Sequence, residues 1–216
     1  MSIFKLIIII FSFFLSIGYG MTLIDMALPF NLNQPSIQYF LVGFGIFIPL
    51  WLFWLRSNQF YSTFEHELTH LLVGLLFLKK PAHFTVTSHE GGETGLYGKN
   101  FLITLAPYFI PTFAYLLLPF YLIINSEYHL PYFTVLGFMV SYHVLSTIQE
   151  FSYRQPDIAT SGKLFSTIFL IFANIFVYGF LIMFTIGGFA TGGQFIRAGF
   201  LESIYWLSHL VSRMTG

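Results

Sequence analysis

Long apolar runs separated by short polar stretches make up most of the chain. A helix that crosses the bilayer core needs about 20 mostly apolar residues. By that measure the pattern predicts membrane spans at 37–55, 101–124, 132–148 and 164–186. A shorter run at 6–23 follows Lys5 and contains the small-residue sequence Gly18-Tyr19-Gly20, so it is either a retained helix or a signal peptide. We favour the retained helix because the cleavage site is poor.

The run at 60–78 differs from the others, because its first half is polar and only its second half is apolar. Lys79-Lys80-Pro81 ends it. Polar and apolar residues then alternate from His83 to Ser88, and glycines interrupt the pattern at Gly91, Gly92 and Gly95. Alternation followed by glycines predicts a β-hairpin over 83–97.

Four glycines, Gly187, Gly188, Gly192 and Gly193, predict a link before the last segment, 195–214. That segment mixes apolar residues with Arg197, Glu202, His209 and Arg213, which favours a helix lying in the membrane interface. We therefore expect an all-α membrane protein with five or six transmembrane helices, a small membrane-associated β-hairpin and a C-terminal interfacial helix. The whole chain, 1–216, would form one integral membrane domain, with spans 6–23 and 37–55 preceding a core at 60–186.

Composition agrees with this expectation. Of the 216 residues, 56% are hydrophobic and 8% are charged, against roughly 25% charged in a soluble domain. So few charges exclude a water-soluble globule and make the lipid bilayer the surroundings of a multi-pass protein. Nine basic residues balance nine acidic ones, which argues against nucleic acid as a partner. Cysteine is absent, so disulfides and Cys-ligated zinc are excluded.

The basic residues bear on topology. If the segment 60–78 does not cross the membrane completely, most of them fall on the cytoplasmic side: Lys5, Arg56, Lys79, Lys80, Lys99, Arg154 and Lys163. If it crosses fully, they are split between the two faces, against the positive-inside rule. The charge distribution thus favours a partly inserted or broken helix at 60–78.

That helix carries the sequence His66-Glu67-Leu68-Thr69-His70. Residues four apart share a helix face, so the two imidazoles can reach one metal ion, with Glu67 beside it as a general base. In a chain of this length and composition, the pattern His-Glu-x-x-His is expected by chance roughly 0.007 times. Charged side chains within a membrane segment are expensive and usually functional. The alternative is that these polar residues merely lie at the interface, which would not explain their order.

A hydrolytic zinc site needs a third protein ligand and leaves one position to water. The residues themselves leave that ligand open. The candidates are Asp157, His143, Glu150, His89, Glu90 and Glu93. Asp157 would otherwise be a helix N-cap or interface acid, and His143 a hydrogen-bonded core histidine. The second aspartate, Asp25, lies in the polar stretch before the second span.

The motif in an apolar helix, the glycine-rich hairpin and the later Asp157 resemble the site-2 protease family of intramembrane zinc metallopeptidases, in particular its small bacterial branch without accessory domains. The resemblance covers roughly residues 60–173. It implies a peptidase-like core, zinc held by His66, His70 and Asp157, and Glu67 as the catalytic base. The family often has Leu-Asp-Gly at the third ligand, whereas this chain has Pro156-Asp157-Ile158.

The same resemblance implies an endopeptidase in a bacterial plasma membrane that hydrolyses a peptide bond in or next to a transmembrane segment. Its partners would be a transmembrane or membrane-associated protein substrate and the bilayer. The family's hairpin is thought to receive the unwound substrate as an added strand. The rival interpretation is a non-enzymatic membrane metal carrier, or a pseudoprotease that binds membrane clients. A carrier should have acids and histidines on several spans, whereas here they concentrate on one span and one flank.

Overall fold

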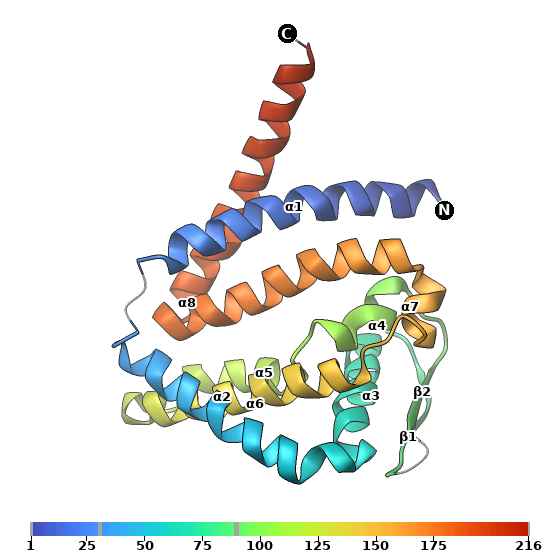
Figure 1. The fold of residues 1–216 in the computed structure, drawn as a ribbon, viewed down its shortest axis with the longest axis vertical. Helices are drawn as coiled ribbons and strands as arrows, with labels where there is room; N and C mark the ends of the chain where they lie inside the picture. The colour runs from blue at the N-terminus through green and yellow to red at the C-terminus, as the bar shows by residue number, and fades with distance from the viewer. Residues whose placement is uncertain (1, 30–31, 89–90, 216) are drawn as a thin grey trace. The chain divides into compact units, whose positions relative to one another are not determined.

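The computed structural model describes residues 2–29, 32–88 and 91–215 (Figure 1). The α-helices are α1 (Ile3–Ala27), α2 (Pro35–Phe53), α3 (Gln59–Leu76), α4 (Phe101–Leu105), α5 (Thr112–Leu117), α6 (His129–Glu150), α7 (Pro156–Ser161) and α8 (Lys163–Thr215). Short 3-10 helices occur at Leu55–Ser57, Ala106–Tyr108, Leu118–Leu122 and Ser126–Tyr128. The strands are β1 (Pro81–Val86) and β2 (Gly92–Leu96).

By its internal packing the chain divides into two compact units. The first combines residues 1–34 with 162–216, so that α1 packs along α8. Gly18 lies directly against Ser203, and the Tyr19 hydroxyl donates a hydrogen bond to the Ile196 carbonyl at 2.9 Å. Tyr19 also forms a buried cluster with Met183 and Phe195. Small residues at such contacts allow two apolar helices to approach closely.

The second unit, residues 35–161, contains α2 to α7 and the hairpin. Its most extensive contact between helices is the one between α2 and α6. The two backbones approach so closely there that glycines are required. A Cβ on Gly43 would collide with the Thr134 carbonyl, and one on Gly137 would collide with the Phe40 carbonyl. Helix α3 also packs against α6.

The predicted hairpin is confirmed: β1 and β2 pair antiparallel, with Phe84 opposite Thr94. It packs on α3, whose start is capped by the Asn58 side chain, which accepts from the Phe60 N–H at 2.9 Å. The Thr94 hydroxyl donates to the Glu67 carbonyl at 2.9 Å, so β2 is anchored in the middle of the motif helix. Gly92 lies so close to α3 that a Cβ there would be 2.7 Å from Glu67 Cγ.

Two expectations about the apolar segments are wrong in detail. The segment 101–124 is not one continuous span, because it is bent by 93° between residues 101–108 and 112–122, where prolines interrupt it. The expected four-glycine link is only a kink, since Gly187 and Gly188 alone leave helical geometry, while Gly192 and Gly193 are helical. The last helix therefore resumes directly after Gly188, before the predicted start at 195.

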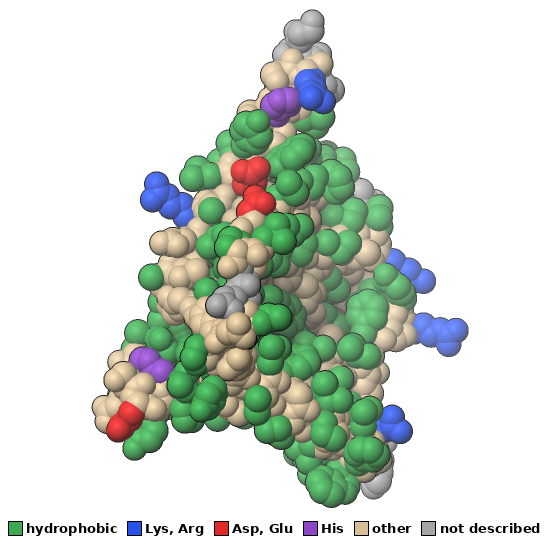
Figure 2. Space-filling view, turned by 60° about the vertical axis from the view of Figure 1, so that its left-hand side comes forward, with side chains coloured by type: hydrophobic (Ala, Val, Ile, Leu, Met, Phe, Trp, Pro, Cys, Tyr) green, Lys and Arg blue, Asp and Glu red, His purple; other side chains and the backbone are tan. Residues whose placement is uncertain are grey.

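Within the described residues, three helices are long and apolar enough to cross a membrane, α1, α2 and α8, and the bent pair would make a fourth. The predicted five or six spans are not confirmed. Hydrophobic side chains are exposed over most of the face seen in Figure 2, with only scattered charges between them. Ile3, Phe53 and Leu78 are each more than three-quarters exposed, although they are large and apolar. Such exposure suits a protein surrounded by lipid.

Candidate metal centre

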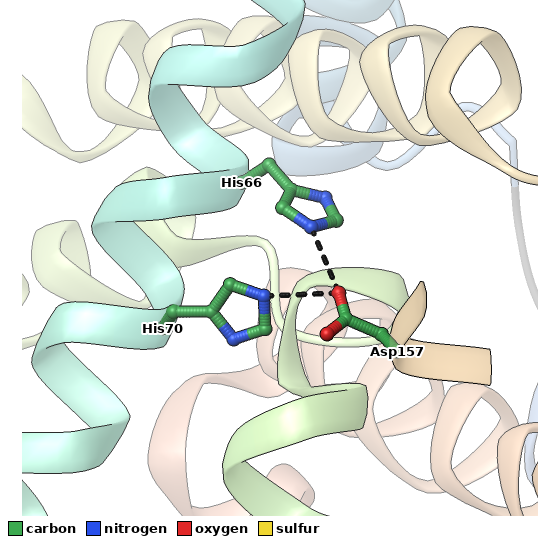
Figure 3. Close-up of side chains that lie close together, drawn as sticks. All are labelled: His66, His70 and Asp157. Atoms are coloured by element: carbon green, nitrogen blue, oxygen red, sulfur yellow. Dashed lines mark hydrogen bonds and ion pairs between the residues drawn. The ribbon is translucent and has the colours of Figure 1, made fainter. Parts of the chain in front are cut away.

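Two imidazoles and one carboxylate converge at a single point of the second unit (Figure 3). His66 and His70 project from the same face of α3, as their spacing predicts, and Asp157 comes from α7. Asp157 Oδ2 lies 3.3 Å from His66 Nε2 and 3.1 Å from His70 Nε2. The three potential ligand atoms lie within 4.8 Å of one another. Among the described residues, no other group of three His, Asp or Glu side chains meets so closely.

Asp157 is positioned by the short helix α7, which begins at Pro156 and so places the aspartate in its first turn. Proline suits the first turn because its missing N–H would have no partner there. The next residue, Ile158, is completely buried and fixes the helix in the core, where α7 packs on α4. The glycine that the family often has after its aspartate is therefore replaced here by a packing residue. After Asp157, the first residue with a left-handed conformation is Gly162 (φ +96°).

His70 is oriented by a backbone carbonyl on its other side. Its Nδ1 lies 2.8 Å from the Ile103 carbonyl oxygen, which can only accept, so Nδ1 carries the hydrogen. This leaves Nε2 as the nitrogen that faces Asp157. The carbonyl is placed by α4, whose first turn is capped by Asn100 through a 2.9 Å bond from the Ile103 N–H. A hydrogen bond of this kind selects the tautomer that a metal requires.

His66 has an aromatic neighbour. The Tyr108 ring meets the His66 ring edge to face, with centroids 5.2 Å apart. Tyr108 is itself buried, at 3% exposure.

The electrostatics favour an ionised carboxylate. Burial raises the pKa of Asp157, but its interactions with the neighbouring imidazoles of His66 and His70 outweigh burial and hold the pKa well below its usual range. A carboxylate and two imidazoles are the donor set that zinc accepts in hydrolytic sites, with one position left for water. The residues therefore fit a zinc ion by both chemistry and spacing.

Glu67 follows His66 on α3 and is 8% exposed. It is not one of the three converging residues, and it lies under the hairpin, where Gly92 approaches its side chain. Its role as the catalytic base remains a prediction, which rests on its place directly after His66 in the motif.

The other candidate ligands lie elsewhere. His143 Nδ1 is 3.2 Å from Glu65 Oε2, and Glu150 accepts a hydrogen bond from Thr63 at 3.2 Å. Glu93 pairs with the exposed His83 at 3.4 Å on the hairpin. Asp25 is exposed on α1, in the other unit, and His89 and Glu90 lie outside the described residues.

Sequence reasoning missed three features of this centre: the Ile103 carbonyl, Tyr108 and the pairing of Glu65 with His143. A backbone carbonyl 33 positions from its partner leaves no signal in a sequence. His143 did have a signal, since it is an ionisable residue in an otherwise apolar segment, whereas Glu65 lies within the polar first half of 60–78.

Comparison with protein families gives one finding. The family model described as Peptidase M50B-like matches residues 40–203, about three-quarters of the chain. The chain belongs to the Peptidase M50B-like family. This is the site-2 protease family of intramembrane metallopeptidases, so the resemblance inferred from the motif is confirmed. No curated protein and no solved structure matches the chain.

Membership in the M50B-like family gives the converging residues a context. The family is one of metallopeptidases, and the group of His66, His70 and Asp157 could hold a metal ion. Several long apolar helices, together with the family, support an integral membrane protein. All three converging residues and Glu67 belong to the second unit, so this unit alone contains the candidate site.

Proposed function

We propose that the protein is a zinc-dependent endopeptidase that hydrolyses a peptide bond in or next to a transmembrane segment of a protein substrate. The observation that carries the proposal is the convergence of His66, His70 and Asp157 on one point, in a chain of a metallopeptidase family. Zinc bound there would polarise the scissile carbonyl and lower the pKa of the attacking water towards about 7.

The chain's own side chains would bind the metal ion and transfer the protons. His66, His70 and Asp157 bind the ion, and the Ile103 carbonyl keeps His70 in the ligating tautomer. Glu67 takes the proton from the attacking water and then delivers a proton to the leaving amine nitrogen.

The hairpin supports a protein substrate. A helical peptide bond must be unwound before it can be hydrolysed, and the freed backbone groups then need hydrogen-bond partners. In the described two-stranded sheet β1 pairs only with β2, so its other edge offers unpaired N–H and C=O groups. Residues 81–85 of β1 are exposed. Strand addition at this edge would hold an unwound substrate segment in extended form.

The proposal is tested by measuring zinc content and cleavage on one preparation. We expect about one zinc per purified chain, absent from a His66→Ala/His70→Ala double variant. Co-expression with a library of single-span substrates should yield cleavage in or next to the span, abolished by chelation and restored by zinc.

Stoichiometric zinc retained by the double variant would refute the site assignment. Zinc binding without cleavage of any substrate, by the wild type and the Glu67→Gln variant alike, would instead favour a metal carrier or a client-binding pseudoprotease.

A further inference from the structure

A second buried polar cluster lies beside the metal centre, between α3 and α6. The Glu65 and His143 side chains are each 1% exposed and form an ion pair at 3.2 Å. The Ser146 hydroxyl donates to the same carboxylate oxygen, Glu65 Oε2, at 3.4 Å. Neither Glu65 nor His143 is among the converging metal ligands, so the proposed reaction leaves this pair without a role.

Only one of the two oxygens of the Glu65 carboxylate has hydrogen-bond donors. Both donors reach Glu65 Oε2, while no group of the described residues donates to Oε1, which is equally buried. Burying a carboxylate oxygen without a donor costs about 1–3 kcal/mol or more of folding free energy, because the oxygen loses its hydrogen bonds to water and forms none in the protein. Native structures rarely tolerate this, and the usual partner in such a place is an ordered water.

The space for that partner is present. A small cavity is lined by Glu65 and His143 and also by the metal-facing His66. Its free volume is about 10 Å³, which is close to what one water needs. Pro107 is the one apolar residue named in its lining, which also includes Glu150, a partly exposed residue. The lining therefore reaches from the partly exposed end of α6 to the buried pair.

We propose that this cavity is a water-binding site, in which a single water donates to Glu65 Oε1, and that it supplies the hydrolytic water to the metal centre past His66. The second part rests on the proposed peptidase function. Hydrolysis consumes one water per turnover, and apolar surroundings hold almost none. A polar cavity that shares a wall with a metal ligand holds water where the reaction would use it.

X-ray hydroxyl-radical footprinting of the zinc-loaded wild type tests the site directly, because radicals form from bound water even where bulk solvent has no access. We expect His143 to be oxidised despite its burial. Met183, completely buried in an apolar cluster with Tyr19 and Phe195, should stay protected although methionine is intrinsically more reactive. Protection of His143 equal to that of Met183 would overturn the proposal.

A matched pair of variants on α6 tests the supply of water. Ser146→Val replaces the hydroxyl with one methyl group and adds a second beside the cavity, whereas Ser141→Val makes the same change at a buried position outside the cavity. We expect Ser146→Val to lose His143 oxidation and to lower kcat about tenfold or more, with zinc content unchanged. Ser141→Val should keep both.

Oxidation of His143 tests whether the cavity binds water, and kcat tests whether that water reaches the reaction. Wild-type kcat in a Ser146→Val protein that no longer oxidises His143 would refute the supply of water through this cavity. If the wild type cleaves no substrate, the peptidase proposal fails, while the oxidation of His143 still decides whether the cavity binds water.

Discussion

At the scale of single residues, the motif determines much of the centre and the packing determines the remainder. The spacing of His66 and His70 alone predicts that both imidazoles share a helix face, and they do. Asp157 could not be chosen over His143 by spacing, because both are far from the motif in sequence. The resemblance strengthened the case for Asp157, and the structure groups it with the histidines through the burial of Ile158.

The third ligand gives a prediction at this scale. Asp157→Ala should weaken zinc binding about tenfold or more, because it removes the carboxylate that meets both imidazoles. Competition with a chromogenic chelator measures the affinity. Asp25→Ala is the control, since that aspartate is exposed on α1. Unchanged affinity in Asp157→Ala, with a loss in His143→Ala, would show that His143 is the ligand instead.

At the scale of elements, local patterns predicted the hairpin but not the bend of 93° within 101–122. Alternation and glycines are local signals, so β1 and β2 could be placed from the sequence. The segment 101–124 contains prolines, and whether a proline bends or breaks a membrane helix depends on what packs against it. Likewise, four glycines predicted a link, while only Gly187 and Gly188 leave the helical conformation.

The contact between hairpin and motif helix gives a second prediction. Gly92→Ala should lower cleavage while zinc content stays normal, because the added Cβ would lie 2.7 Å from Glu67 Cγ and Thr63 Cγ2. Such overpacking costs about 1–3 kcal/mol, and a shift of Glu67 by about 1 Å can cost about 100-fold in rate. Gly45→Ala, with no atom within 4 Å of the new Cβ, is the matched control. Equal rates in both variants would show that the hairpin does not set the position of Glu67.

The topology of α3 gives a third prediction. Single cysteines at Arg56 and Lys80, just before and after this helix, should react with a membrane-impermeant thiol reagent from the same, cytoplasmic, side. The reason is the positive-inside rule, which a fully crossing α3 would violate. The chain has no cysteine of its own, so the background is clean. Labelling of the two positions from opposite sides would prove that α3 crosses completely.

At the scale of the whole molecule, composition alone indicated a membrane protein, because 8% charged residues cannot cover a soluble surface. The division into two units was not predictable from hydropathy. It brings α1 beside α8 from opposite ends of the chain, through contacts such as Tyr19 with Phe195 that no local pattern reveals. The candidate site needs only the unit of residues 35–161.

The central claim, proton transfer by Glu67 at a metal centre, is tested most directly by Glu67→Gln. Glutamine has nearly the same shape but cannot accept the proton of the attacking water. General acid–base catalysis is worth about 10²–10⁴ in rate, so kcat should fall by at least that factor while zinc stoichiometry stays at the wild-type value. Glu127→Gln, the same change at an exposed residue, should leave both unchanged. A Glu67→Gln protein that cleaves its substrate at the wild-type rate would contradict the peptidase function.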